Sequence, residues 1–139
     1  GFPMMPSAMP ITGGASGETF GARIATGDQN NDGFCDVIVS NTAANSRAGA
    51  ATLYFGSASG LSGSVSLAPP SGAQAFGAAK ILGDATGDGV SDVVVGAPGY
   101  TTADTHQIVL YYGGGSGALG ASSLTIPRSL TDFGSGFAQ

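Results

Sequence analysis

Charged side chains are scarce in this 139-residue chain, where they make up 9% of the residues. Only four of them are cationic (Arg23, Arg47, Lys80 and Arg128), and the net charge is −5 at pH 7. A nucleic-acid interface or an attachment to anionic lipid needs a basic surface, which so few cations cannot build. We therefore expect no nucleic-acid partner. Because charged residues of both signs make up only 9% of the chain, a charge-rich helical bundle or coiled coil is also excluded.

Cysteine, histidine and long apolar runs are also scarce. No apolar run approaches the ~20 residues that span a bilayer, so we expect no membrane insertion. The single cysteine, Cys35, cannot form an internal disulfide. As a nucleophile it would need a nearby base, and the single histidine, His106, lies far away in the sequence without a supporting motif. We expect Cys35 to be half-buried, His106 to lie in a loop or at a strand end, and the chain not to be an enzyme.

Two copies of one pattern organise the chain, which contains 25 glycines. Residues 20–39 align without a gap with residues 76–95, and residues 52–56 match residues 109–113. Phe133-Gly134 opens a third copy. The pattern predicts a closing strand of a preceding unit or a linker at 1–19, two full units at 20–75 and 76–132, and an opening strand at 133–139. It also suggests a processed chain or a piece of a longer one.

Each unit contains the same four short stretches of strand-forming residues. Runs such as Val37-Ile38-Val39 and Val93-Val94-Val95 are β-branched and typical of buried strands, and no stretch has a helical apolar period. The predicted class is all-β, with four-stranded antiparallel sheets of the size of β-propeller blades. A single blade cannot bury both of its faces, so it must stack on neighbours. The predicted strands are residues 22–26, 37–39, 51–55 and 64–67, then 78–82, 93–95, 107–112 and 122–126.

Six of the nine acidic residues lie in two segments, residues 28–36 and 84–92. Such concentrated carboxylates repel one another unless a cation offsets their charge. Each segment has side-chain oxygens at its first, third, fifth and ninth residues and can offer a backbone carbonyl at its seventh. This set of oxygens suits a hard cation such as Ca²⁺. Zinc or copper would need imidazole or thiolate ligands. The predicted ligands are Asp28, Asn30, Asp32, the Phe34 carbonyl and Asp36 at one Ca²⁺ site, and Asp84, Thr86, Asp88, the Val90 carbonyl and Asp92 at the other.

Two alternatives for these segments remain open at this point. They could be Asp-Gly hairpin turns without a metal, although such turns need one Asp rather than three. An EF-hand loop begins with the same spacing but needs a Glu at its twelfth place, where this chain has Val39 and Val95. The hydroxyl of Thr86 is a poorer ligand than the amide oxygen of Asn30, which predicts weaker binding in the second loop. Four residues that tolerate positive φ accompany the acidic ones: Asn31, Gly33, Gly87 and Gly89.

The second copy closely resembles the FG-GAP repeat of integrin α-subunit propellers and many bacterial surface proteins. Phe76-Gly77 and Gly96-Ala97-Pro98 flank its acidic loop, as the two name elements of that repeat do. The first copy keeps Phe20-Gly21 and the loop but has Ser40-Asn41-Thr42 in the last position. The resemblance implies a propeller blade with Ca²⁺ between its first and second strands, and an extracellular role in adhesion or ligand recognition. Propellers of this family have more blades than two.

These expectations combine into a calcium-stabilised, extracellular structural or adhesion module at the cell surface. It would assemble with other copies of itself or with further blades, as part of a larger propeller or a filament, and it could bind a protein or glycan ligand. One alternative is a lectin-like propeller that binds carbohydrate, for which the aromatic candidates are Tyr100, Tyr111 and Tyr112. Another is the accessory propeller of a larger secreted enzyme.

Overall fold

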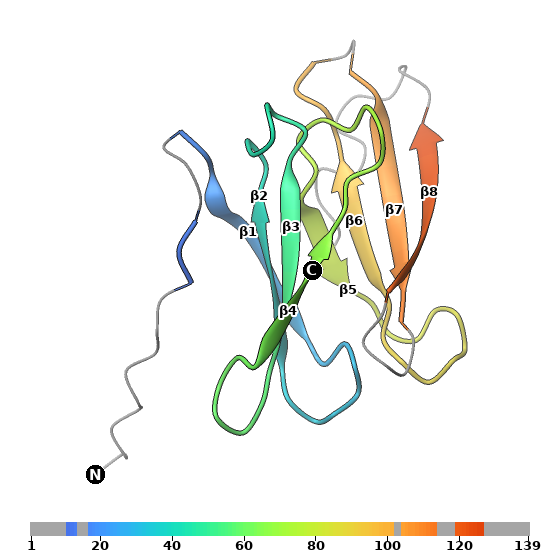
Figure 1. Ribbon diagram of the computed structural model, residues 1–139. Helices are drawn as coiled ribbons and strands as arrows, with labels where there is room; N and C mark the ends of the chain where they lie inside the picture. Colours follow the sequence, from blue (N-terminus) through green and yellow to red (C-terminus); the bar gives the residue numbers. More distant parts are fainter. Residues whose placement is uncertain (1–10, 14–16, 102–103, 114–118, 127–139) are drawn as a thin grey trace.

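The computed structural model describes residues 11–13, 17–101, 104–113 and 119–126, and these residues form eight strands and no helix (Figure 1). The all-β class is therefore confirmed. The strands are β1 (Phe20–Gly27), β2 (Asp36–Asn41), β3 (Ala50–Phe55), β4 (Gly63–Leu67), β5 (Ala78–Ile81), β6 (Val93–Ala97), β7 (His106–Tyr112) and β8 (Gly120–Ile126).

The strands form two four-stranded sheets, β1-β2-β3-β4 and β5-β6-β7-β8. Each strand pairs antiparallel with the next one along the chain, so both sheets are meanders, and every predicted strand has a counterpart. The two sheets do not close a ring, so the propeller stays a prediction. The predicted opening strand at 133–139 and most of the segment 1–19 lie outside the described residues.

A hydrophobic core lies between the two sheets. β6, which is buried along its whole length, supplies the centre of one side, and Ile38 and Leu53, paired across β2 and β3, supply the other. Both Ile38 and Leu53 are 0% exposed. The fully buried members of the core are Ile38, Ala51, Leu53 and Leu67 from the first sheet, Val93, Val95, Ala97, Val109 and Tyr111 from the second, and Ala73 and Phe76 from the segment between them.

Opposite faces of the two repeat units meet in this core. The sequence alignment places Ile38 over Val94, yet Ile38 belongs to the shared core and Val94 does not. The neighbours of Val94, Val93 and Val95, belong to it instead, because successive side chains of a strand point to opposite faces. The front of one unit therefore packs on the back of the next, as in a stack of repeats and unlike a two-fold sandwich.

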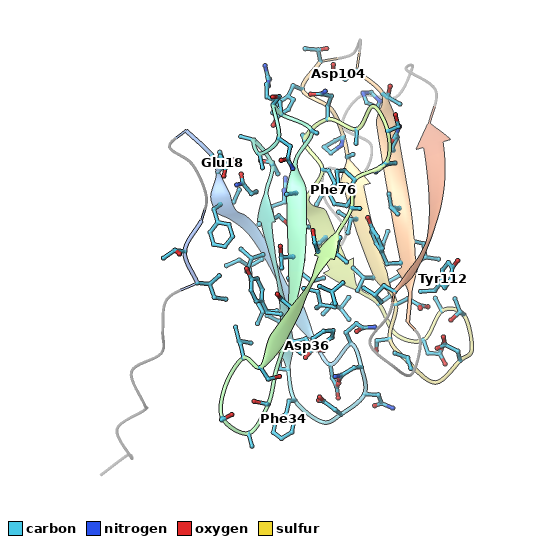
Figure 2. The ribbon with its side chains drawn as sticks, viewed as in Figure 1. Glu18, Phe34, Asp36, Phe76, Asp104 and Tyr112 are labelled. Atoms are coloured by element: carbon cyan, nitrogen blue, oxygen red, sulfur yellow. The ribbon has the colours of Figure 1, made fainter. Side chains whose placement is uncertain are left out.

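Phe76 connects the two units at their boundary. It is 0% exposed, lies between the sheets (Figure 2), and its ring packs edge-on against that of Tyr111 with 6.4 Å between centroids. Its backbone N–H donates to the carbonyl of Ala48 in the first unit, at 3.0 Å. Ser40, which aligns with Gly96 of the second unit, donates its hydroxyl to the Gly77 carbonyl at 2.6 Å. This difference between the two copies thus makes a contact between the units.

Three sequence expectations meet different outcomes. His106 begins β7, as predicted, although it is buried. The expectation of a half-buried Cys35 is wrong, because this side chain lies exposed in the loop before β2. The gapless alignment also hides a difference in strand register. Val39 aligns with Val95, but Val39 pairs with Ile24, whereas Val95 pairs with Ala79, which aligns with Arg23.

The described part of the chain contains no helix that could cross a membrane.

Candidate metal centre

The two acidic loops connect β1 with β2 and β5 with β6, and they lie at the same end of the two sheets (Figure 1). Each makes a sharp turn through left-handed residues. In the first loop Asn31 has φ 60° and Gly33 has φ 87°, and in the second Gly87 has φ 82° and Gly89 has φ 87°. The four residues singled out for positive φ therefore adopt it.

In the first loop, side-chain oxygens converge around the backbone of Asp32. The N–H of Asp32 lies 3.1 Å from an oxygen of Asp28 and 3.2 Å from the side-chain oxygen of Asn30. The second oxygen of Asp28 accepts the N–H of Gly33 at 2.9 Å. The carboxylate of Asp32 accepts the Asn30 amide at 2.8 Å and the N–H of Phe34 at 2.9 Å. Asp28, Asn30 and Asp32 are thus brought together, while their role as ligands stays a prediction.

The second loop repeats this arrangement around Asp84. Its carboxylate accepts the N–H groups of Gly87 at 2.6 Å, Asp88 at 3.0 Å and Gly89 at 2.7 Å. These bonds, the one from Gly89 above all, lower the pKa of Asp84. Asp88 accepts the N–H of Val90 at 2.9 Å, the same contact that Asp32 makes with Phe34.

The ninth residue of each loop has a different environment. Asp36 is 0% exposed, and its two oxygens accept the N–H groups of Gln29 and Gly56, both at 2.8 Å. It therefore ties the start of its loop to the end of β3. We call this arrangement the Asp36 clamp.

Asp92 forms the equivalent clamp in the second unit. It is also 0% exposed, and one oxygen accepts the N–H groups of Ala85 at 2.8 Å and Thr86 at 3.0 Å. Its other oxygen accepts the N–H of Gly113, just after β7, at 3.1 Å. Both clamps need no ion to satisfy their oxygens, since backbone donors occupy them.

Gly56 and Gly113 belong to the two clamps, and the sequence analysis did not single them out. A Cβ at Gly56 would lie 2.4 Å from the carbonyl oxygen of Cys35, and one at Gly113 would lie 2.5 Å from Cγ1 of Val90. Only glycine lets the end of the third strand approach the loop so closely. The available signal was the repeated aromatic-Gly pair that ends residues 52–56 and 109–113.

The donor chemistry of each loop fits a hard cation. Every side chain that converges offers oxygen, and an oxygen that accepts one N–H keeps a second lone pair for a cation. The fit rests on Asp28, Asn30 and Asp32 in the first loop and on Asp84 and Asp88 in the second, where Thr86 contributes a backbone N–H to Asp92. No three Asp, Glu, His or Cys side chains gather as a metal group within the described ranges. Asp36 and Asp92 face backbone N–H groups, so their role as direct ligands stays a prediction, like that of the Phe34 and Val90 carbonyls.

The three tyrosines of the carbohydrate alternative do not share one platform. Tyr111 is 4% exposed and belongs to the core, whereas its neighbour Tyr112 is 40% exposed on the other face of β7. Tyr100 follows β6 beside Asp104, at the end of the sheets opposite to Tyr112 (Figure 2). There the guanidinium of Arg47 lies 3.9 Å from its ring centroid.

No protein-family model matches this chain, and no curated protein shows significant similarity to it in sequence. The resemblance to the FG-GAP repeat therefore depends on the motif residues themselves.

Proposed function

We propose that this chain is a structural or adhesion module of propeller blades that works outside the cell and binds calcium in its two acidic loops. The observation that carries the proposal is the packing of the front of one repeat unit on the back of the next. Among the described residues, one face of each sheet lies outside this contact, and we call it the uncovered face of that sheet, although Val39 and Val94 on these faces are buried. Each uncovered face is of the kind that is buried between the two units.

A further unit can be added at either end by the same contact. Val37 and Thr52 are half-buried on the uncovered face of the first sheet, and Ile24 is 64% exposed there. Val93 and Val95 occupy the corresponding face of the second sheet and are 0% exposed. Repeated head-to-tail contacts give a ring when the rotation closes and a filament when it does not. The partners are therefore other copies of the chain or further blades.

Calcium is the cation that the loops suit best. Mg²⁺ dehydrates reluctantly and keeps several waters, whereas Ca²⁺ accepts many protein oxygens in a flexible geometry. Calcium near millimolar concentration outside the cell would fill even weak sites of this kind. An ion in each loop would offset the repulsion among its three carboxylates and hold β1 to β2 and β5 to β6 at one end of the sheets.

The other functions receive less support from the described residues. A lectin-like site needs an aromatic platform, and the tyrosines at 100, 111 and 112 lie apart. As an accessory propeller of a larger enzyme, the chain would still serve as a structural module, and the reaction would belong to residues elsewhere.

Thermal unfolding and sedimentation test the proposal together. Calcium should raise the melting temperature relative to EDTA by mass action, and magnesium at the same concentration should raise it less. The chain should sediment as an oligomer whose size depends on concentration. An unchanged melting curve after verified metal removal would overturn the calcium sites. A sharp monomer boundary at all concentrations, with native β-sheet signal, would overturn the assembly.

A further inference from the structure

The first acidic loop contacts the second through one buried side chain, Gln29. The carbonyl of Gln29 accepts the N–H of Ser91 at 3.0 Å, and its side-chain Nε2 donates to the Ser91 carbonyl at 2.9 Å. Gln29 thereby pairs with both backbone groups of a residue 62 positions away. A second, longer contact joins the Asn31 amide to the Gly89 carbonyl at 3.4 Å.

Gln29 also touches the clamps of both loops. Its own N–H donates to Asp36 at 2.8 Å, and Ser91 immediately precedes Asp92. The backbone N–H of Gly113 donates to the other oxygen of Asp92. The Nε2 of Gln29 lies 3.1 Å from the place that a Cβ would take on Gly113. A displacement of the first clamp therefore moves a residue that is hydrogen-bonded to Ser91, the neighbour of Asp92.

This link has no counterpart within the second loop. The residue aligned with Gln29 is Ala85, which has no side-chain amide. Gln29 is 1% exposed, and its Oε1 is buried without a hydrogen-bond partner. Burial of an unpaired oxygen costs free energy, and the side-chain bond from Nε2 to the Ser91 carbonyl offsets part of that cost. The side chain is thus fixed by its contacts with the second loop.

We propose that Gln29 couples the two acidic loops, so that ordering of the first loop rigidifies the second. The cation that would order the first loop rests on the proposed function. When the first loop is ordered in this way, the second loop loses less conformational entropy on binding its own ion. Its affinity for calcium then rises without a change of ligands. The coupling acts through Gln29 as a positioning residue between Asp36 and Ser91.

Hydrogen exchange in EDTA tests the coupling without any ion. Asp28→Ala loosens the first loop by removing the acceptor of two N–H groups, those of Asp32 and Gly33. The readout is the exchange rate of the amides that donate to Asp92 in the second loop. With Gln29 present, Asp28→Ala should raise these rates about five-fold or more, the lower limit of typical coupling. In the Gln29→Ala chain, which loses the Nε2 bond and keeps the backbone bond to Ser91, the same change should raise them less than it does with Gln29 present.

Gln107→Ala is the matched control. Gln107 is a second buried glutamine with an unpartnered Oε1, and its Nε2 donates to the Ser71 carbonyl at 3.2 Å, away from the loops. This variant should keep the full response to Asp28→Ala. Gln29→Met keeps the side-chain volume and removes the Nε2 donor, so it replaces Gln29→Ala if that variant fails to fold. An equal response with and without the Gln29 amide overturns the coupling.

Calorimetric titration with calcium separates this inference from the proposed function. The affinity of the second loop should fall about five-fold or more when Asp28→Ala disables the first, and the fall should be smaller in the Gln29→Ala background. Coupled exchange without calcium binding would reject the calcium sites and keep the coupling. Calcium binding at both loops with an identical fall in both backgrounds would keep the sites and reject the coupling.

Discussion

The backbone N–H of Gly56 donates to a buried oxygen of Asp36 at 2.8 Å, across 20 residues of chain. Gly113 and Asp92 make the same contact at 3.1 Å across 21 residues. In each unit this bond closes the acidic loop onto the end of the third strand. It explains why the two copies match both in the loop and at the distant aromatic-Gly pair, since the two segments form one structural element.

The Asp36 clamp should contribute strongly to stability. Asp36→Ala leaves the N–H groups of Gln29 and Gly56 without their acceptor in a buried site. Hydrogen bonds to a charged group contribute about 1.5–3 kcal/mol each, so the free energy of unfolding should fall by about 3 kcal/mol or more in urea. Asp104→Ala is the control, because Asp104 also accepts two backbone N–H groups but is only half-buried, whereas Asp36 is 0% exposed. Equal losses in both variants would contradict the clamp.

Replacing the glycines of the closure should also destabilise the fold. Gly56→Ala drives a Cβ to within 2.4 Å of the rigid Cys35 carbonyl, and such overpacking costs about 1–3 kcal/mol. Gly113→Ala meets the side chain of Val90, which can shift, so its cost should be smaller. Gly83→Ala, with no atom within 4 Å of its Cβ, should be close to neutral. Urea midpoints that do not follow this order would contradict the close approach.

The fold was largely predictable from local patterns, and the contacts of the site were not. β-branched runs such as Val93-Val94-Val95 indicate strands, and the spacing of acidic and glycine residues predicts the turns of both loops. The partners of Asp36 are backbone N–H groups, which every residue except proline carries, so no side chain signals them. The two units also differ by one residue in the pairing of their first two strands, since Val39 pairs with Ile24 but Val95 pairs with Ala79. A gapless alignment cannot show this difference, although a one-residue slip reverses the face of every side chain of a strand.

Alkaline pH should unfold the protein through Tyr111. Burial raises the pKa of Tyr111 from its ordinary value of 10.0 to about 12, and its hydroxyl donates to the Ala68 carbonyl. The stabilisation is fully present below pH 10.0, because the phenol is then neutral in both states, and it is lost as the pH rises toward about 12. Tyr111→Phe should be less stable at neutral pH and should lack this alkaline loss. Tyr112→Phe, at a 40% exposed position, should retain it in the same melting series.

The third place of the second loop should limit its calcium affinity. Thr86 offers one hydroxyl where the first loop offers the amide oxygen of Asn30. Thr86→Asn should tighten the second site, and a ten-fold gain in affinity corresponds to about 1.4 kcal/mol. The melting temperature should rise in saturating calcium and stay unchanged in EDTA. Ser59→Asn, in the loop between β3 and β4, controls for a general effect of asparagine. An equal rise in EDTA would show that the gain is not due to the ion.

Ile24 marks the uncovered face of the first sheet. It is 64% exposed on β1 and pairs with Val39, on the face that points away from the second sheet. Burying such a side chain contributes about 1.5–3 kcal/mol, and a lysine at this position would bring a charge into the contact between copies. Assembly through this face should therefore be sensitive to a single substitution.

Ile24→Lys should weaken the association between copies at least about ten-fold, because the lost burial alone exceeds about 1.4 kcal/mol. Sedimentation at micromolar concentration should shift toward the monomer, while the β-sheet signal of the folded chain persists because Ile24 lies outside the core between the sheets. Leu61→Lys is the matched control: Leu61 is 46% exposed and belongs to the loop between β3 and β4 rather than to a strand of that face. If the two variants assemble equally well, the copies do not meet through the uncovered face of β1 and β2.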